Sequence, residues 1–155
     1  MTTATALIFK SASFANGGQI DVRHTCDGSN QSPELEWSHA SDGALSLALV
    51  VVDPDAPSGD FTHWVLFDIP ASVHALAEGT TGIGVSGRND FQEIGYGGPC
   101  PPKKHGPHRY FFRLFALDVD SLGLAKGATR QEVEGAIENH ILEQAELMGR
   151  YTRAG

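Results

Sequence analysis

Two acidic residues set between prolines, with a histidine a short turn further on, are the side chains best suited to chemistry in this sequence. They lie in the stretch DPDAPSGDFTHWV, which begins at Asp53 and contains His63. A second histidine, His108, opens the stretch HRYFFRLFALD. One carboxylate with two imidazoles can hold a small anion when the histidines are charged, and it can also form the two-histidine, one-carboxylate set that holds a catalytic metal.

Three predicted strands would have to position these residues. Apolar, β-branched runs predict strands over residues 44–53, 62–69 and 108–118. Side chains alternate across a strand, so each polar residue can be assigned to a row on one face. The rows are Leu45, Leu47, Leu49, Val51 and Asp53; His63, Val65, Phe67 and Ile69; and His108, Tyr110, Phe112, Leu114 and Ala116.

Each polar residue is the end member of an otherwise apolar row. If the strands are antiparallel neighbours, Asp53, His63 and His108 meet at one rim of the core, with Tyr110 one step below. A mostly apolar hollow with a few converging polar groups is the usual form of a small-ligand site. We therefore expect a binding site at this rim.

The loop that leads into His108 supports this expectation. It reads GYGGPCPPKKHGP over residues 95–107. Gly97 and Gly98 allow the backbone to come close to a ligand, and Pro99, Pro101 and Pro102 stiffen the loop. Backbone N–H groups beside two histidines can hold a phosphate-like anion.

The rest of the chain predicts a mainly β protein. Eighteen glycines and eight prolines indicate many tight turns. Near the C-terminus, Thr129 and Glu132 form a capping box, and apolar residues follow at helical spacing: Val133, Ala136, Ile137, Ile141, Ala145 and Met148. We expect an antiparallel β-sandwich-like core with one long or two short C-terminal helices packed at its periphery.

Length and charge narrow the class of protein. The 155 residues suit a single domain spanning residues 1–155, and the net charge of −8 argues against a nucleic-acid or anionic-membrane surface. No apolar run approaches the roughly 18 residues that span a bilayer, so no stable membrane insertion is expected. The first residues lack a signal-peptide pattern, which predicts a cytoplasmic protein. Cys26 and Cys100 are expected to be two reduced thiols, with a single bridge left open.

Several motifs together resemble one family. DPDAP, THWV and GPCPPKKHGPHRYFF are similar to motifs of the phosphatidylethanolamine-binding protein family, also called Raf kinase inhibitor-like proteins, and most of all to its bacterial and archaeal branch. HTCDGSNQSPELEW resembles that branch's N-terminal motif, and GATRQEVEGAIENHILEQAELMGRY its C-terminal helical segment. The resemblance implies a β-sandwich-like fold and a pocket for phosphate, phosphorylethanolamine-like headgroups or similar small anions.

The resemblance also implies which residues form the pocket. The ligand-binding set would be Asp53, His63, Gly98, Pro102, His108 and Tyr110. The supporting set would be Asp55, Pro57, Trp64, Cys100 and Arg109. The residues themselves add that Arg109, on the face opposite His108, is expected to form an ion pair with one of the acids, and that Asp55 is expected to be structural.

The remaining histidines are expected to lie outside the site. We expect solvated side chains at His24, His39, His74 and His105. His140 lies near the apolar stripe of the predicted helix and is expected to be a packed core residue.

The function predicted is non-enzymatic binding of a small anion or phospho-headgroup, with a kinase- or protease-inhibitor-like regulatory role as a further expectation. A metal-dependent hydrolase using Asp53, His63 and His108 is the alternative, and a pure interaction protein is a third reading. No HExxH or GxSxG motif is present, and neither a cofactor nor a resident metal is predicted. A homodimer and a protein partner are expected, as is anion affinity that rises as pH falls through about 6.5.

Overall fold

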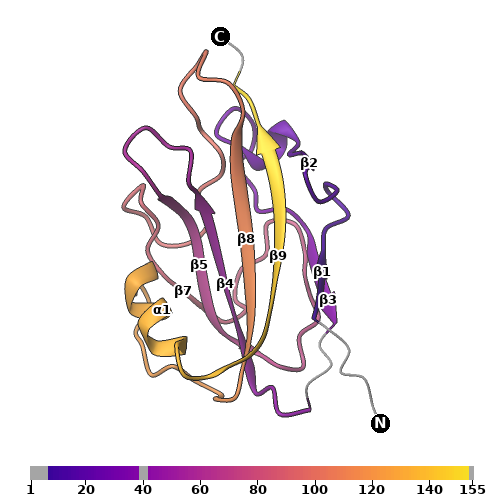
Figure 1. The fold of residues 1–155 in the computed structure, drawn as a ribbon, viewed down its shortest axis with the longest axis vertical. Helices are drawn as coiled ribbons and strands as arrows, with labels where there is room; N and C mark the ends of the chain where they lie inside the picture. Colours follow the sequence, from indigo (N-terminus) through magenta and orange to yellow (C-terminus); the bar gives the residue numbers. More distant parts are fainter. Residues whose placement is uncertain (1–6, 39–41, 154–155) are drawn as a thin grey trace.

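Two sheets and one helix make up the part of the chain that the computed structural model describes, which is residues 7–38 and 42–153. The larger sheet has the order β2-β9-β8-β4-β5-β7, and the smaller has the order β1-β3-β6 (Figure 1). The elements in chain order are β1 (Ile8–Lys10), β2 (Gly18–Gln19), a 3-10 turn (Val22–His24), β3 (Leu35–Ser38), β4 (Ser46–Asp53), β5 (Phe61–Pro70), β6 (Ala75–Leu76), β7 (Val85–Ser86), β8 (His108–Leu117), α1 (Arg130–Ile137) and β9 (Ile141–Tyr151).

The main core fills the space between the two sheets. The small sheet contributes Phe9, Leu35 and Trp37, and the large sheet contributes alternate residues of β4, β8 and β9. Every residue of β4 is buried, because α1 and its neighbouring loops cover part of the other face of the large sheet with a second apolar cluster (Figure 1). The expected mainly β, sandwich-like architecture is confirmed.

The C-terminal segment differs from the prediction. The capping box at Thr129 and Glu132 forms and starts α1, but the helix ends at Ile137. Residues 141–151 form β9, which pairs antiparallel with β8 from His108↔Tyr151 to Leu117↔Ile141. The helical spacing of Ile141, Ala145 and Met148 was misleading, because every second residue at the end of the segment (Leu147, Gly149 and Tyr151) is buried, as in a strand.

The prediction for His140 is wrong for the same reason. It lies in the turn between α1 and β9, where its ring nitrogen Nδ1 is 2.8 Å from Oδ1 of Asp118. The side chain is 41% exposed, so it is not a core residue.

A β-bulge in β5 changes the face to which His63 belongs. Val51 pairs with Trp64 and Val52 pairs with Thr62, which leaves His63 without a partner on β4. Val65 and Phe67 face the cluster under α1, whereas Trp64 lies in the main core. Strict alternation would therefore have pointed His63 toward the helix side. The bulge turns it to the face of Tyr110 instead, and bulges often re-aim side chains in this way.

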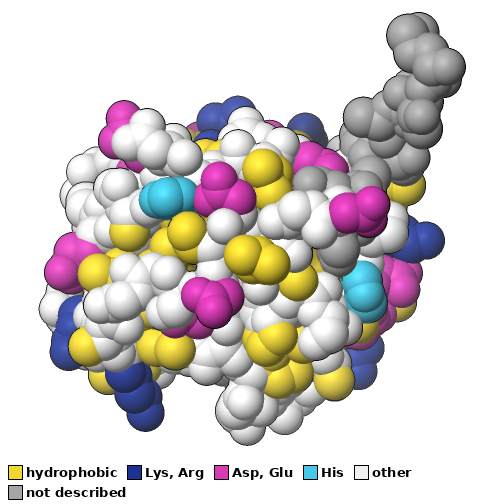
Figure 2. All heavy atoms as spheres, turned by 90° about the horizontal axis from the view of Figure 1, so that it is seen from below, with side chains coloured by type: hydrophobic (Ala, Val, Ile, Leu, Met, Phe, Trp, Pro, Cys, Tyr) yellow, Lys and Arg dark blue, Asp and Glu magenta, His cyan; other side chains and the backbone are white. Residues whose placement is uncertain are grey.

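The surface agrees with an acidic protein. The end of the molecule seen from below in Figure 2 has acidic and apolar side chains intermixed, with Lys and Arg toward its edges. Within the described residues, no helix is long and apolar enough to cross a membrane.

The assignment of residues 130–137 to α1 and of residues 141–151 to β9 predicts opposite effects for a glycine substitution in each. A Cβ at Gly149 would lie 2.5 Å from Cγ1 of Ile20 and 2.9 Å from Cε2 of Phe14, so Gly149→Ala should destabilise the fold by about 1–3 kcal/mol through overpacking. A Cβ at Gly135, inside α1, meets no atom within 4 Å, so Gly135→Ala should stabilise by about 0.5–1 kcal/mol. Urea unfolding measures both. Stabilisation by Gly149→Ala would instead support a helix in this segment.

Candidate functional site

A small cavity opens at the end of the main core where β4 ends and β5 and β8 begin. Its volume is about 250 Å³. The lining residues are Asp53, Ala56, Pro57, Ser58, Phe61, His63, Phe91, Cys100, Pro101, Pro102, His108 and Tyr110. The three strand ends that carry Asp53, His63 and His108 therefore meet around one hollow, with Tyr110 beside them.

Asp53 and His108 form a buried pair in the cavity wall. Nδ1 of His108 lies 2.6 Å from Oδ2 of Asp53, and each residue is at most 3% exposed. The other oxygen, Oδ1 of Asp53, accepts the backbone N–H of Asp55 at 2.7 Å. Both oxygens of this carboxylate thus have partners, as a buried charge requires.

His105 extends this pair toward the surface. Its Nδ1 is 2.6 Å from Nε2 of His108, so one hydrogen lies between the two rings. His105 was expected to be solvated, and it is exposed, but it also covers the outer nitrogen of a buried site histidine. The link exists because the loop of residues 101–107 turns back through positive φ angles at Lys104 and Gly106.

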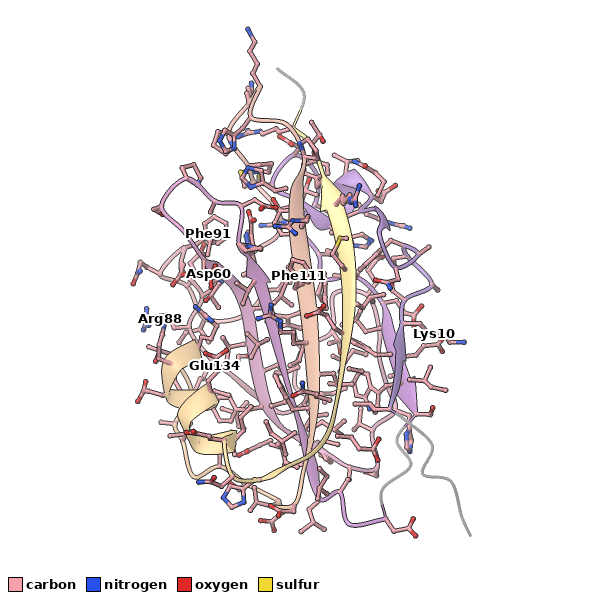
Figure 3. All side chains as sticks on the ribbon, in the orientation of Figure 1. Lys10, Asp60, Arg88, Phe91, Phe111 and Glu134 are labelled. Atoms are coloured by element: carbon pink, nitrogen blue, oxygen red, sulfur yellow. A yellow bond between two sulfur atoms is a disulfide. The ribbon has the colours of Figure 1, made fainter. Side chains whose placement is uncertain are left out.

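His63 is fixed by the loop that crosses the bulge. Nδ1 of His63 donates to the carbonyl oxygen of Gly97 at 2.8 Å, which leaves Nε2 for another partner. The ring packs against Phe61, Phe91 and Tyr110 at centroid distances of 5.0, 5.4 and 5.1 Å. Figure 3 labels Phe91, which the loop after β7 brings to the start of β5. Burial lowers the pKa of His63 below its ordinary value, so the neutral ring is favoured.

Tyr110 carries an unsatisfied polar group in the cavity wall. The residue is 1% exposed, and its hydroxyl makes no hydrogen bond to any described residue. Burial raises the pKa of Tyr110, with a further contribution from the negative charge of Asp53. The hydroxyl therefore keeps its hydrogen and can donate it to a ligand.

Asp55 and Arg109 form an ion pair beside the cavity. Nε and Nη2 of Arg109 donate to the Asp55 carboxylate at 2.9 and 2.8 Å, and the backbone N–H of Arg109 donates at 2.9 Å. These hydrogen bonds hold the pKa of Asp55 at about 2. The pair ties the turn after β4 to the start of β8 and so keeps Asp53 and His108 in register.

Gly98 and Trp64 lie elsewhere than the resemblance implied. The N–H of Gly97 donates to the carbonyl of His63, and the N–H of Gly98 donates to Oδ1 of Asn30 at 2.9 Å. These two amides are therefore not available to an anion. A Cβ at Gly98 would lie 2.1 Å from the carbonyl oxygen of His24, so glycine is required here by packing against the protein itself. Trp64 lines a different, larger cavity.

A disulfide replaces the two reduced thiols that we expected. Cys26 and Cys100 are bonded across a sequence separation of 74 residues. The bridge holds the loop after the 3-10 turn against the Pro-rich loop, and Cys26 N–H also donates to the carbonyl of Pro99 at 3.1 Å. Disulfides persist mainly in oxidising compartments, so the bridge weakens the basis for a cytoplasmic location, which stays a prediction.

His24 was also expected to be solvated, and this is wrong. It is fully buried, and its Nδ1 lies 2.9 Å from the carbonyl oxygen of Gln31. His74 is exposed, as expected, and His39 lies outside the described residues.

The aromatic lining of the cavity was missed in the sequence. Phe61 directly precedes the predicted strand, and Phe91 lies in a Gly-rich stretch without periodicity. No sequence pattern marks either residue as part of the site. Their rings pack against His63 and contribute to its burial.

Comparisons with known proteins agree with the sequence motifs. The sequence profile described as phosphatidylethanolamine-binding protein matches residues 10–152. The chain belongs to the phosphatidylethanolamine-binding protein family. A UPF0098 protein of Aquifex aeolicus is 49% identical over 149 residues, covering 92% of this chain and 86% of its own length. A UPF0098 protein of Methanothermobacter thermautotrophicus is 47% identical over 150 residues, which cover 93% of this chain and 97% of that protein.

Solved structures of the family share the fold. The phosphatidylethanolamine-binding protein homologue CT736 of Chlamydia trachomatis superposes with a TM-score of 0.90 at 38% identity, covering 96% of this chain and 98% of its own. YbcL of Escherichia coli gives a TM-score of 0.89 at 31% identity, and the match covers 96% of this chain and 99% of YbcL. The fold and the family placement are therefore confirmed together.

The Asp55–Arg109 pair predicts how acid affects stability. Because the pKa of Asp55 is lowered from 3.8 to about 2, its stabilising effect is complete above pH 3.8 and is lost as pH falls through 2. Asp55→Asn should lower the free energy of unfolding by about 1 kcal/mol at neutral pH, since the pair is partly exposed. The difference from the parent protein should shrink below pH 3.8 in chemical unfolding. If the difference in the free energy of unfolding stayed constant down to acid pH, the ionised Asp55 carboxylate would not be what stabilises the fold.

Proposed function

We propose that the small cavity binds a phosphate-type anion, either free or as the headgroup of a small phosphomonoester such as O-phosphorylethanolamine, without catalysing a reaction. The observation that carries the proposal is the buried Tyr110 hydroxyl, which keeps its hydrogen and has no acceptor among the described residues. Buried polar groups in folded proteins are almost always hydrogen-bonded, so an exception inside a cavity indicates a missing partner. A phosphate oxygen supplies that acceptor.

The charges around the cavity favour the binding of an anion even though the Asp53 carboxylate lies in its wall. Asp53 is already compensated by His108 and by the N–H of Asp55, so its repulsion of a ligand is reduced. Protonated His63 would present Nε2–H to the ligand, because its Nδ1–H is held by Gly97. Tyr110 and His63 would then donate to the same oxyanion from adjoining rings.

The size of the cavity sets the size of the ligand. About 250 Å³ lies below the range of roughly 300–1,000 Å³ that is usual for sites of drug-sized ligands. A phosphate with a short substituent suits this volume, whereas an acyl chain does not. Binding of a headgroup is therefore the form in which a lipid would be recognised.

The hydrolase alternative gains no support from the geometry. Asp53 is engaged by His108 and by a backbone amide, and Nδ1 of His63 is engaged by Gly97. Within the described residues, no three His, Cys, Asp or Glu side chains are arranged to hold a metal ion. The regulatory role, the protein partner and the homodimer stay predictions.

Tyr110→Phe tests the observation on which the proposal depends. Removing the hydroxyl should weaken phosphate binding by about tenfold, the loss of one charge-assisted hydrogen bond of about 1.4 kcal/mol. Stability of the ligand-free protein should be unchanged or higher, because an unsatisfied buried group is removed. Calorimetric titration with phosphate and urea unfolding measure the two effects. Unchanged affinity, or a loss of stability in the ligand-free protein, would remove the hydroxyl from the site.

The lowered pKa of His63 predicts the direction of the pH dependence. An anion favours the charged ring, so affinity should rise by about tenfold between pH 8 and pH 5.5, most steeply below 6.5. Sulfate should be titrated beside O-phosphorylethanolamine. Because sulfate stays doubly charged over this range, any pH dependence of its affinity comes from the protein. His63→Gln should flatten the dependence. His140→Gln, at the far end of β9, is the matched control and should leave it intact. Equal affinity at both pH values in the parent protein would contradict the role of His63.

A further inference from the structure

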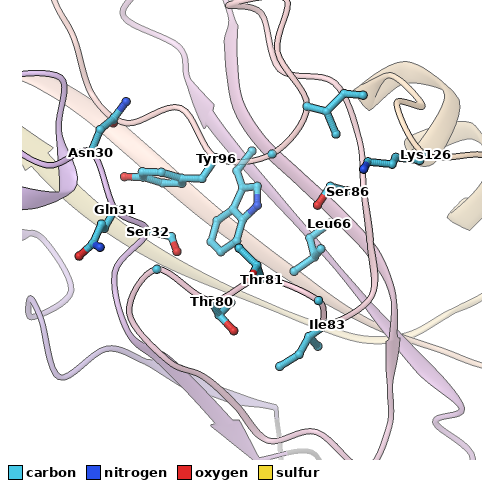
Figure 4. A pocket seen from close by; sticks show the side chains of 15 residues that line it. Asn30, Gln31, Ser32, Leu66, Thr80, Thr81, Ile83, Ser86, Tyr96 and Lys126 are labelled. Atoms are coloured by element: carbon cyan, nitrogen blue, oxygen red, sulfur yellow. The ribbon is translucent and has the colours of Figure 1, made fainter.

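A second and larger cavity lies on the other side of the loop that fixes His63. It has a volume of about 510 Å³ and shares no lining residue with the small cavity. We call it the side cavity. Its lining includes Trp64, Leu66 and Tyr96, together with residues 30–32, residues 79–83, Ser86 and Lys126. Figure 4 shows Tyr96, Leu66 and Ser86 among the side chains that surround it. Nothing in the proposed anion binding uses it.

Several polar side chains around the side cavity have no hydrogen-bond partner among the residues that the structure describes, although Asn30 and Tyr96 do have one. The hydroxyls of Ser32, Thr80, Thr81 and Ser86 and the indole N–H of Trp64 form no hydrogen bond with any described residue. Ser32 is only 4% exposed and Trp64 only 3%. Both residues line the cavity, and neither polar atom is among the fully buried unpartnered atoms, so both remain accessible from the cavity. Several unpaired hydrogen-bonding groups that converge on one cavity with apolar walls are typical of a small-ligand site.

The chemistry of the lining selects the ligand. Neither a carboxylate nor a histidine lines the side cavity, and Lys126 is an exposed residue of its rim. Hydroxyls and the amides of Asn30 and Gln31 can both donate and accept hydrogen bonds. Leu66, Ile83 and Ile94 add apolar surface. A molecule with many hydroxyls and with C–H faces between them matches both kinds of surface.

We propose that the side cavity binds a neutral polyhydroxylated molecule of mono- or disaccharide size. The volume lies within the range usual for small-molecule sites. The two aromatic side chains of the lining are held by contacts within the protein: the Tyr96 hydroxyl donates to the carbonyl of His24 at 2.6 Å, and the Tyr96 ring stands edge-on to Trp64 at a centroid distance of 5.2 Å. A rigid site loses less entropy when a flexible polyol binds.

The two tryptophans of the chain provide the test and its internal reference. The Trp37 indole N–H donates to the carbonyl of Val73 at 3.1 Å, whereas that of Trp64 has no partner among the described residues. In a proton–nitrogen correlation spectrum of the labelled protein, D-glucose, D-galactose or sucrose should shift the Trp64 indole signal and leave the Trp37 signal in place. If none of the three sugars shifts the Trp64 signal, the proposal is wrong. A response to glucose 6-phosphate alone would overturn the assignment to a neutral ligand.

Variants then locate the binding. Ser32→Ala and Thr81→Ala should each weaken the sugar response by about three- to tenfold, the loss of one hydrogen bond. Thr81 is exposed on a loop, so Thr81→Ala keeps the test valid if Ser32→Ala fails to fold. Ser58→Ala, in the small cavity, is the matched control and should leave the sugar response unchanged. Parent-like responses of both Ser32→Ala and Thr81→Ala would contradict the assignment whether or not the small cavity binds phosphate.

Discussion

One backbone irregularity, the bulge at His63, decides what the interior of this protein can do. Without it, His63 would continue the row of Val65 and Phe67 toward α1, and the core beside Tyr110 would lack its second imidazole. With it, His63 and Trp64 both serve the face that looks toward the small sheet, one in each cavity. An unpaired residue weakens the ladder locally, so its presence at this point indicates that the position of the ring matters more than regular pairing.

The buried negative charge of the small cavity also needs partners within the protein. A buried carboxylate is unfavourable unless it is paired and hydrogen-bonded, and Asp53 satisfies this through His108 and its own turn. Asp55 then has a separate partner in Arg109, on the outer side of the sheet. The two acids of one DPD sequence therefore have different roles: one belongs to the cavity, and the other ties together the two chain segments that form its wall.

The strands could be predicted from the sequence, whereas their register could not. The strands of Asp53, His63 and His108 were predicted to within about two residues, because long apolar runs leave little choice. Residues 141–151 carry apolar side chains that satisfy both a helical and a strand period, and pairing with β8 decides between them. The bulge, the disulfide and the place of Phe91 depend on contacts between distant segments, which no local pattern encodes. The site was anticipated for a reason that was partly wrong, since alternation alone places His63 on the other face.

Residues 96–100 form a wall between the two cavities, and the disulfide and two hydrogen bonds hold this wall in place. The Cys26–Cys100 bridge, the Gly98–Asn30 hydrogen bond and the Tyr96–His24 hydrogen bond all join the N-terminal loop to residues 96–100. Cys100 lines the small cavity, and Asn30 and Tyr96 line the side cavity. A Cβ at Gly98 would lie 2.1 Å from the carbonyl oxygen of His24, so this cross-linked wall is also closely packed. Because this wall contributes residues to both cavities, a ligand that displaced it in one cavity would also change the lining of the other.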